Sequence, residues 1–541
     1  MIGSRRSISV CVCCSYMLGG RRMAAEETPS TPLRRTPWRR SIENSRAFFL
    51  NDYGQTLFPL KTNRFLAEFG FDQLLDFGLS AAATDESDFR AFLPQRSVSA
   101  LKAGWHQRRT VKLDPVAEVF IYDFMFRNRG LIRGAISTKR ECYGYTFKNG
   151  VPISPTLSYR GFKGAKSEYA STYRHSLSFD VASYFNSVYH HDLTEWAEDR
   201  RFSGEDVLLV GRFLRETKSG RSIDCLPQGL YPTKMVGNDF LKFIDNSARL
   251  VSSQLIRFMD DIVIFSDNKH DLVSDFYFIQ DLLGQRGLSI NSAKTKTSEE
   301  EHDVASAVDE VKKGLLRKRR SVISRDYSQD DAEEADEVRS VVRNLTKKEV
   351  ARLKAMLNEP HLEEEDAELI LTLMGENSAD VLGRFDDLLE DFPNLSKSLH
   401  SFCRHIVDRE SLAETIFLHL SKPIFVPEYQ LFWIGMILDD YLLKTKKAGE
   451  IIRKLTSHPQ STPITIAKIL EIPTSDFGLP EFRLDHLREG KSDWHAWSAA
   501  VGSRGAPKAT RNQILKYYKN ASPINAVIAN IVSSYDGGVF D

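Results

Sequence analysis

Two adjacent carboxylates, Asp260 and Asp261, have the setting in this sequence that most clearly indicates chemistry. They stand inside residues 255–265, where apolar runs rich in β-branched and aromatic side chains flank the pair. This pattern predicts a strand, a tight turn that carries both acids, and a second strand. Because neighbouring carboxylates beside buried strands are costly unless a positive charge meets them, we expect a divalent metal ion here. Enzymes that transfer phosphoryl or nucleotidyl groups use such a pair, with one distant carboxylate, to hold two hard cations.

The distant carboxylate is predicted to be Asp180, at the end of a short strand. Phe185 follows it closely in the sequence. Between the two acidic segments, residues 226–233 form a predicted turn that contains Gln228 and Gly229 and opens into a helical pattern.

A fourth segment, residues 287–295, follows the pair of acids and contains Lys294. The segments read in order Phe-Asp-(x)4-Phe, Pro-Gln-Gly, Phe-Met-Asp-Asp and Gly-Leu-(x)2-Asn-(x)2-Lys-Thr. In this order they resemble the palm motifs A to D of reverse transcriptases. Viral RNA-dependent RNA polymerases usually carry Gly-Asp-Asp, and a Ser-Gly in motif B. This sequence has neither at these positions, which favours an enzyme that makes DNA.

The resemblance implies catalytic and metal-binding roles for Asp180, Asp260 and Asp261. They would hold two Mg²⁺ ions, with Mn²⁺ as an alternative, for nucleotidyl transfer. Three structural acids are the competing interpretation. Phe185 occupies the slot in which the family carries an aromatic residue beneath the sugar of the incoming nucleotide, where its bulk would exclude a 2′-hydroxyl. Ordinary core packing is the alternative for Phe185.

Three further residues are predicted to bind the nucleotide. Gln228 and Gly229 would approach the template or nucleotide backbone, where a side chain at position 229 would be in the way. Lys294 would protonate or screen pyrophosphate, and an ordinary surface lysine is the alternative. Thr233 departs from the family pattern, which often has serine at this position.

Residues 186–196 and 141–147 resemble segments of bacterial abortive-infection and other defence-associated reverse transcriptases. This resemblance implies an RNA-directed or non-templated DNA polymerase of antiphage defence. Its partners would be RNA or DNA and deoxynucleoside triphosphates, with a homo-oligomer or a second reverse transcriptase subunit left open. A retron-type or group II intron-type reverse transcriptase that copies its own RNA is one alternative. A scaffold with the same fold and a decayed catalytic site is another.

The bulk properties are those of a folded cytoplasmic protein of more than one core. The chain has 541 residues, of which 42% are hydrophobic and 27% charged, and its formal net charge is zero. Neutrality argues against a purely electrostatic DNA-coating protein but not against a polymerase with a local basic track. The six cysteines indicate neither a disulfide framework nor a zinc site. No apolar run reaches the roughly 18–20 residues of a membrane span, so we expect no membrane partner.

The predicted fold class is α+β: the fingers and antiparallel palm sheet of a right-hand-shaped polymerase, followed by an all-α, helical-repeat-like domain. The predicted boundaries are a disordered leader at 1–40, with Met23 as an alternative start, fingers at 41–170, the palm at 171–297, a charged linker at 298–340 and a solenoid-like helical domain at 341–541.

Two basic clusters are candidates for phosphate contacts. One follows the apolar segment 119–126 and is predicted to form a surface for nucleic acid or for the incoming triphosphate, with a solvated basic surface as the alternative; its members are Arg127, Arg129, Arg133, Lys139 and Arg140. The other, residues 312–320, is predicted to touch the template backbone or to be a solvated connector.

Overall fold

The computed structural model describes residues 35–83, 92–132, 137–218, 226–297, 310–325, 345–537 and 540. The chain divides into two compact units, Met1–Arg40 and Ser41–Asp541. Of the first unit only the backbone of residues 35–40 is described. The predicted leader and its alternative start at Met23 therefore lie outside the described residues.

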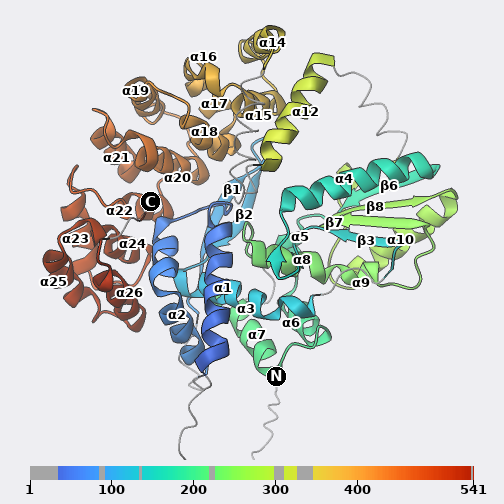
Figure 1. Cartoon of the computed structure of the whole chain (residues 1–541), viewed down its shortest axis with the longest axis horizontal. Coiled ribbons are helices and arrows are strands. Elements are labelled where there is room, and N and C mark those ends of the chain that lie inside the picture. Colours follow the sequence, from blue (N-terminus) through green and yellow to red (C-terminus); the bar gives the residue numbers. More distant parts are fainter. Residues whose placement is uncertain are drawn as a thin grey trace, which may run out of the picture. The chain divides into compact units, whose positions relative to one another are not determined.

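A five-stranded sheet carries the predicted carboxylates (Figure 1). Its spatial order is β3 (Arg140–Tyr143), β7 (Gln254–Phe258), β8 (Asp261–Ser266), β6 (His175–Asp180) and β9 (Lys296–Thr297). All neighbouring strands are antiparallel except β3 and β7, which run parallel. The predicted antiparallel sheet thus has one exception, at a pair whose strands are joined by a long connection, as parallel pairing requires.

Helices cover both faces of this sheet (Figure 1). Helix α4 (Pro155–Thr172) packs on β3, β7 and β8, and α10 (Lys269–Gly284) packs on β6 and β8. Successive strand residues alternate between the two faces. On the α4 face the buried apolar side chains are Phe162, Ala165, Ile256, Val263 and Phe265. On the opposite face they include Leu255, Ile262, Ile264, Ile279 and Leu283.

The fingers-like region is a helical layer with two small hairpins. Its elements are α1 (Arg35–Tyr53), α2 (Lys61–Ala82), the hairpin β1 (Arg96–Leu101) and β2 (Gln107–Lys112), α3 (Pro115–Asn128), and the hairpin β4 (Phe147–Lys148) and β5 (Val151–Pro152). Helix α3 begins where the carboxylate of Asp114 accepts a hydrogen bond from the backbone N–H of Ala117. The apolar segment 119–126 lies within this helix and is buried throughout.

Short helices connect β6 to β7. They are α5 (Tyr184–Ser187), α6 (His190–Asp199), α7 (Gly204–Thr217), α8 (Tyr231–Phe240) and α9 (Lys242–Asp245). The predicted turn at 226–233 leads into α8, which carries Pro232 in its first turn, where proline's missing N–H costs no helical hydrogen bond. Lys234 is the one residue of α8 that is not buried.

The helices after residue 345 divide between two hydrophobic cores. The core that also contains α12 (Glu310–Arg325) includes α14 (Lys347–Leu357), α15 (Glu364–Leu373), α16 (Ser378–Leu382), α17 (Phe385–Asp391), α18 (Ser396–Cys403), α19 (Arg409–His419) and α21 (Ala448–Ser457). Residues of α24 (Trp494–Gly502), α25 (Lys508–Tyr518) and α26 (Pro523–Ser534) share the core of α1, α2 and α3. Helices α20 (Glu428–Ile437), α22 (Pro463–Leu470) and α23 (Leu479–Arg488) contribute to both. A regular helical repeat stays a prediction, because these helices are shared with the fingers-like layer.

The basic run at 312–320 lies in α12, and three of its cations pair with acidic side chains of α14 and α15. The ion pairs are Lys312 with Asp366, Lys318 with Glu349, and Arg319 with Glu368. This part of the predicted charged linker is therefore a docked helix. The acidic run at 330–337 lies outside the described residues. Within the described part of the chain, no helix is both long enough and apolar enough to cross a lipid bilayer.

Candidate active site

The register of the central strands brings the three predicted carboxylates to one end of the sheet. Asp180, the last residue of β6, lies directly opposite Asp261, the first residue of β8. Asp261 also pairs with Phe258 at the end of β7, so that Met259 and Asp260 form the connecting turn. The pairing joins residues that are distant in sequence, and directly opposed residues of antiparallel strands have Cβ atoms about 4.5–5.5 Å apart.

The turn that presents Asp260 has an unusual backbone. Met259 has φ of 55°, in the left-handed region that residues other than glycine rarely adopt. A positive φ at a central position is typical of two-residue hairpin turns, because it matches the twist of the flanking strands. For a residue with a side chain this conformation costs roughly 1–2 kcal/mol, which the surrounding structure must offset. Met259 is buried, with 6% of its surface exposed, so its packing contributes to that stabilisation.

The carboxylates perturb one another. Burial, together with the charges of Asp261 and Asp180, raises the pKa of Asp260 to about 6, against a hydrogen bond from its own backbone N–H. Loss of solvent around the carboxyl and the charge of Asp180 raise the pKa of Asp261. Carboxyl pKa values raised by burial and by like charges mark a place where a cation would be stabilising.

Lys294 lies at the same end of the sheet, as the sequence predicted. Its Nζ donates to Oδ2 of Asp180 at 2.7 Å, and this hydrogen bond raises the pKa of Lys294. The other carboxylate oxygen, Oδ1 of Asp180, is buried and accepts no hydrogen bond from the described residues. A buried carboxylate oxygen without a partner is costly, and it is an acceptor that a metal ion could satisfy.

The donor set fits a hard divalent cation, although it is not assembled as a metal cage. Among the described residues, no three His, Cys, Asp or Glu side chains converge closely enough to hold a metal ion. Like-charged carboxylates repel one another, and Lys294 takes one of the oxygens that the prediction gave to a metal. Asp180, Asp260 and Asp261 nevertheless offer the oxygen ligands that Mg²⁺ or Mn²⁺ prefers, with one of those oxygens unpartnered.

Phe185 lies in α5, in the segment that follows Asp180, with its ring against α8. Its ring contacts Gly237 so closely that a Cβ built on the glycine would lie 3.0 Å from Cζ of Phe185. Its carbonyl accepts a hydrogen bond from the N–H of Leu226 at 2.8 Å. The side chain is only half-buried, so both predicted roles, the sugar-facing residue and the packing residue, remain compatible with its position.

The turn before α8 is held by neighbours in the fingers-like region. The N–H of Gln228 donates to Oγ1 of Thr110 at 2.7 Å. Gly229 has φ of 96°, and a Cβ built on it would lie 2.7 Å from Cγ of Leu57. The predicted need for glycine at position 229 is thus explained by its backbone conformation and by Leu57, without any contribution from a nucleotide.

Two cations that the sequence did not single out lie near the carboxylates. They are Lys102 and Arg108, from the hairpin of β1 and β2. Burial, then the charges of Arg108 and Lys294, lower the pKa of Lys102, whereas Asp260 and Asp180 oppose this shift. Burial lowers the pKa of Arg108 against the charge of Asp260. Nε of Arg108 is buried and has no hydrogen-bond partner among the described residues, so it is available to an anionic ligand.

Three of the five cations that were predicted to bind the triphosphate contact other parts of the protein. Arg127 pairs with Asp123 at 2.6 Å and with Asp206 at 3.2 Å. Arg129 lies over the ring of Phe126, 3.9 Å from its centroid. Arg140 donates to the carbonyls of residues 139, 250 and 252. These contacts tie down the surrounding helix and backbone, and a role of these three residues in binding the triphosphate stays a prediction. Arg133 lies outside the described residues.

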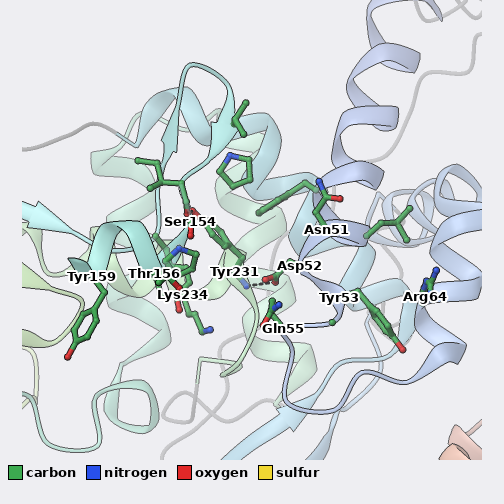
Figure 2. A pocket seen from close by; sticks show the side chains of 18 of the residues that line it. Asn51, Asp52, Tyr53, Gln55, Arg64, Ser154, Thr156, Tyr159, Tyr231 and Lys234 are labelled. Atoms are coloured by element: carbon green, nitrogen blue, oxygen red, sulfur yellow. Dashed lines mark hydrogen bonds between the residues drawn. The ribbon is translucent and has the colours of Figure 1, made fainter. Parts of the chain in front are cut away.

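A cavity of about 850 Å³ adjoins the end of the sheet that carries the carboxylates (Figure 2). It is lined by the loop after α1, the hairpin of β4 and β5, the starts of α4 and α8, and the ring of Phe258. Tyr145 and Tyr159 add aromatic surface, and Nζ of Lys234 lies 4.7 Å from the ring centroid of Tyr145. Oγ of Ser154, at the start of α4, is buried and has no hydrogen-bond partner in the part of the chain that the structure describes.

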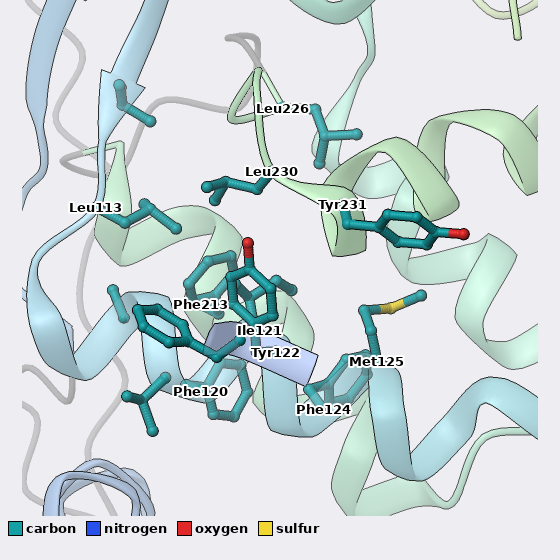
Figure 3. Close-up of a cluster of buried hydrophobic side chains, with 14 of the residues drawn as sticks. Leu113, Phe120, Ile121, Tyr122, Phe124, Met125, Phe213, Leu226, Leu230 and Tyr231 are labelled. Carbon is teal, nitrogen blue, oxygen red and sulfur yellow. The ribbon is translucent and has the colours of Figure 1, made fainter. Parts of the chain in front are cut away.

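Asp52 connects this cavity to the helix that follows the Pro-Gln-Gly turn. Its carboxylate accepts hydrogen bonds from the N–H of Tyr231 at 2.8 Å and from the hydroxyl of Tyr122. Burial raises the pKa of Asp52 despite the nearby charge of Lys234. Figure 3 shows the aromatic core of α3, with Tyr122, beneath Leu230 and Tyr231 of the turn and the start of α8. The turn is therefore fixed from below by packing and at its end by Asp52.

The C-terminal helices reach the same neighbourhood. Oε2 of Glu428, in α20, accepts a hydrogen bond from the N–H of Ser99 in β1 at 3.2 Å. Tyr429, the next residue, lies near Arg108. Nζ of Lys397, in α18, donates to the carbonyl of Gly54, which lines the cavity. The hairpin that carries Arg108 is thus held by the C-terminal half of the chain.

Comparison with known families places this site inside a recognised region. Residues 139–320, about a third of the chain, match the family model described as reverse transcriptase (RNA-dependent DNA polymerase). No curated protein matches the chain. The matched region contains Asp180, Asp260, Asp261 and Lys294. The match supports a reverse transcriptase domain in the chain, with nucleotidyl transfer as its chemistry and nucleic acid and deoxynucleoside triphosphates as its substrates.

Proposed function

We propose that this chain is a DNA polymerase, RNA-directed or non-templated, that works by two-metal nucleotidyl transfer. The observation that carries the proposal is the pairing of Asp180 with Asp261, with Asp260 in the adjoining turn. This pairing lies within the region that matches the reverse transcriptase family. The orphaned oxygen of Asp180 and the raised pKa of Asp260 support a cation at this point.

Each residue of the site receives a role in this proposal. Asp180, Asp260 and Asp261 would hold two Mg²⁺ or Mn²⁺ ions through their carboxylate oxygens. Bound metal supplies activation of the primer hydroxyl and charge neutralisation at the leaving pyrophosphate. Lys294, released from Asp180, would donate a proton to pyrophosphate or screen its charge. Phe185, Gln228 and Gly229 would border the nucleotide.

Lys102 and Arg108 would bind the triphosphate. Both carry positive charge close to the carboxylates, and Nε of Arg108 has a hydrogen to donate. Guanidinium groups bind phosphate oxygens with paired hydrogen bonds, which gives direction as well as charge. The adjoining cavity, with Tyr145, Tyr159 and Lys234, is suited to unpaired nucleotides of an RNA or DNA strand.

We assign the polymerase to antiphage defence. The support is the resemblance of residues 186–196 and 141–147 to defence-associated reverse transcriptases, together with the long helical C-terminal half. A phage-infection assay tests this role: bacteria that express the wild type should reduce plaque formation, and bacteria that express Asp260→Asn should not. Equal plaque formation with both would remove the defence assignment and leave the enzymatic proposal standing.

The competing proposal is a scaffold without catalysis. It is favoured by Lys294, whose ammonium already pairs with Asp180, and by carboxylates that do not converge as a metal cage. The two proposals differ in one measurement. Full-length protein is incubated with labelled deoxynucleotides and Mg²⁺ or Mn²⁺, with and without a primed RNA template. Incorporation that is lost in Asp260→Asn supports the polymerase, and no incorporation under any of these conditions supports the scaffold.

A further inference from the structure

Arg257, in β7, is completely buried although it carries a full positive charge (0% exposed). Its charge is matched by Asp245, the last residue of α9. Nε and Nη2 donate to the two carboxylate oxygens of Asp245 at 3.0 and 2.6 Å, in a paired arrangement. This salt bridge neutralises the guanidinium through Nε and Nη2, and it leaves Nη1 free to donate to other acceptors.

The remaining arm, Nη1, reaches the turn that presents Asp260. It donates to the carbonyl of Met259 at 2.8 Å. Met259 is the residue with positive φ, and its carbonyl belongs to the peptide group whose N–H donates to the carboxylate of Asp260. Because a peptide group is planar, holding its carbonyl also fixes the direction of its N–H. Arg257 thereby acts on the orientation of the Asp260 carboxylate through one peptide group.

The same arm ties this turn to α8. Nη1 also donates to the backbone and side-chain oxygens of Asn238, both at 3.1 Å. The preceding residue of α8, Gly237, accepts a hydrogen bond from the hydroxyl of Tyr184 at 2.7 Å. Tyr184 lies in α5, in the segment that follows Asp180 along the chain. Helix α8 is thus held to the Asp180 segment on one side and, through Arg257, to the Asp260 turn on the other.

We propose that Arg257 is a positioning residue that sets the geometry of Asp260 relative to Asp180 by holding the carbonyl of Met259 against α8. The inference rests on the proposed function, since it concerns the same carboxylates. Arg257 does not touch substrate or metal; it acts through the peptide group of the turn. Groups that orient metal ligands in this way typically change metal affinity or activity 10–100-fold when they are replaced.

A matched control lies on the neighbouring strand. Arg140, in β3, is also buried (7% exposed), and it donates to three backbone carbonyls. Its partners belong to residues 139, 250 and 252, at the other end of β7 from the Asp260 turn. Replacing Arg140 therefore disturbs a buried guanidinium of the same sheet without touching the turn.

The experiment compares Arg257→Lys and Arg140→Lys in the full-length protein. Lysine keeps the charge but cannot reproduce the paired hydrogen bonds and the third arm of arginine. Mn²⁺ binding is measured by electron paramagnetic resonance of the free ion, the Mg²⁺ requirement by the concentration that gives half-maximal DNA synthesis, and folding by thermal unfolding. We expect Arg257→Lys to weaken Mn²⁺ binding and to raise the Mg²⁺ requirement about 10–100-fold. Arg140→Lys should change both by less than about twofold while lowering the unfolding temperature.

Equal metal affinities in the two variants would overturn the inference, as would an Arg257→Lys protein that binds Mn²⁺ as tightly as the wild type. If Arg257→Lys does not fold, Arg257→Gln combined with Asp245→Asn carries the test, because it leaves no unpaired buried charge. That variant should show the same weakening, and unchanged Mn²⁺ binding by it would overturn the inference. A wild type that neither binds Mn²⁺ nor makes DNA would refute the proposed function itself, and the role of Arg257 with it.

Discussion

Two groups of charged residues in this molecule differ in how their charges are matched. At the end of the sheet, Lys294 pairs with Asp180, one of three neighbouring carboxylates, and the other oxygen of Asp180 has no partner among the described residues. Between α2 and the C-terminal helices, acidic and basic side chains alternate. Lys468 lies between Asp439 at 2.7 Å and Glu471 at 2.8 Å, and Lys61 contacts Asp439 at 2.9 Å.

The matched group is a structural connection. Glu471 and Lys468 are both completely buried (0% exposed), and Glu471 also accepts hydrogen bonds from the N–H and the hydroxyl of Thr62. Burial opposes the charged form of Asp439, but Lys468 and Lys61 outweigh it and hold the pKa of Asp439 below its usual value. Every charge here has a partner, so the group joins the fingers-like layer to the C-terminal helices and leaves no donor or acceptor for a ligand.

The comparison shows how to distinguish a charged binding site from a charged structural connection, which we call a joint. Residue types do not decide, because both groups contain buried acids next to lysines. The completeness of pairing decides: carboxylates with raised pKa values and an unpartnered oxygen indicate a bound cation, whereas a network of direct ion pairs indicates cohesion. The predictions below test whether the unmatched group affects activity and the matched group affects stability.

The largest effect is expected at the unmatched group. Asp260→Asn should reduce DNA synthesis about 10³-fold or more, because a ligand of the metal that stabilises the transferring phosphoryl group is lost. The free energy of unfolding should stay the same or rise, since the substitution removes repulsion from Asp261 and Asp180. Steady-state incorporation and chemical denaturation measure the two quantities. Asp267→Asn, just beyond β8, is the control and should retain activity.

The opposite pattern is expected at the matched group. Lys468→Met should lower the free energy of unfolding by about 3–5 kcal/mol, because it leaves Asp439 and Glu471 buried without their cation. Residual activity per folded molecule, measured below the lowered unfolding temperature, should stay close to that of the wild type. A variant that is stable but inactive would show that this joint belongs to the site, and the distinction drawn above would fail.

The sequence predicted the local parts of the site well. The pair of acids between two apolar runs contains its own strand, turn and strand, so the structure of residues 254–266 follows from short-range pattern alone. The position of Asp180 at a strand end was predicted in the same way. Its shared role with Asp260 and Asp261 came from the resemblance to a family, and its pairing opposite Asp261 was not predicted, because register between distant strands is not encoded in either strand by itself.

What the sequence did not reveal depends on contacts between distant segments. Arg108 lies in a hairpin whose basic strand looks like an ordinary exposed edge, and only the folded chain brings it near Asp260. Arg257 reads as one polar residue in an apolar strand; its partners in α8 and α9 lie elsewhere in the chain. The joint of Lys61 with Asp440 connects segments from opposite halves of the chain, which no local pattern could indicate.

A third prediction sharpens the boundary of the unmatched group. Arg108→Lys should raise the KM for deoxynucleotides about tenfold to a hundredfold, because charged hydrogen bonds to phosphate contribute about 1.5–3 kcal/mol each. Arg129→Lys is the matched control: Arg129 lies over Phe126 and should leave KM unchanged. Nucleotide titration of initial rates measures both. An increase in KM with Arg129→Lys and none with Arg108→Lys would support the sequence-based prediction that Arg129 binds the triphosphate.

Phe185 tests whether the surroundings of the carboxylates face the substrate. Phe185→Val should increase the use of ribonucleotides relative to deoxynucleotides about tenfold, since a smaller side chain makes room for a 2′-hydroxyl. The ratio of the two kcat/KM values measures this effect. Phe243→Val, at a half-buried aromatic packed against the same core, is the control and should leave the ratio unchanged. An unchanged ratio in an active Phe185→Val enzyme would identify Phe185 as a packing residue against Gly237.

The smallest expected effect is on stability and concerns Lys397, a lysine that belongs to neither group. Lys397, in α18, donates to the carbonyl of Gly54 and lies 5.8 Å from the ring centroid of Trp433. Within the described part of the chain, no carboxylate forms an ion pair with Lys397. Burial, then the charge of Lys234, lowers the pKa of Lys397 to about 8, against the charge of Asp52. Its charged form is therefore a cost to the folded state.

The sign of the resulting pH dependence follows from the two pKa values. Lys397 loses its proton near pH 8 in the folded protein and near pH 10.4 in the unfolded chain. Between these values the unfolded chain binds more protons, so the contribution of Lys397 to stability rises with pH and is constant below about pH 8. The free energy of unfolding of the wild type relative to Lys397→Met should accordingly increase between pH 8 and pH 10, by at most about 3 kcal/mol. Urea unfolding of both proteins at several pH values in this interval measures the difference. A difference that stays constant would mean that Lys397 keeps its proton in the folded state because Asp52 matches its charge, and Lys397 would then belong with the balanced joint.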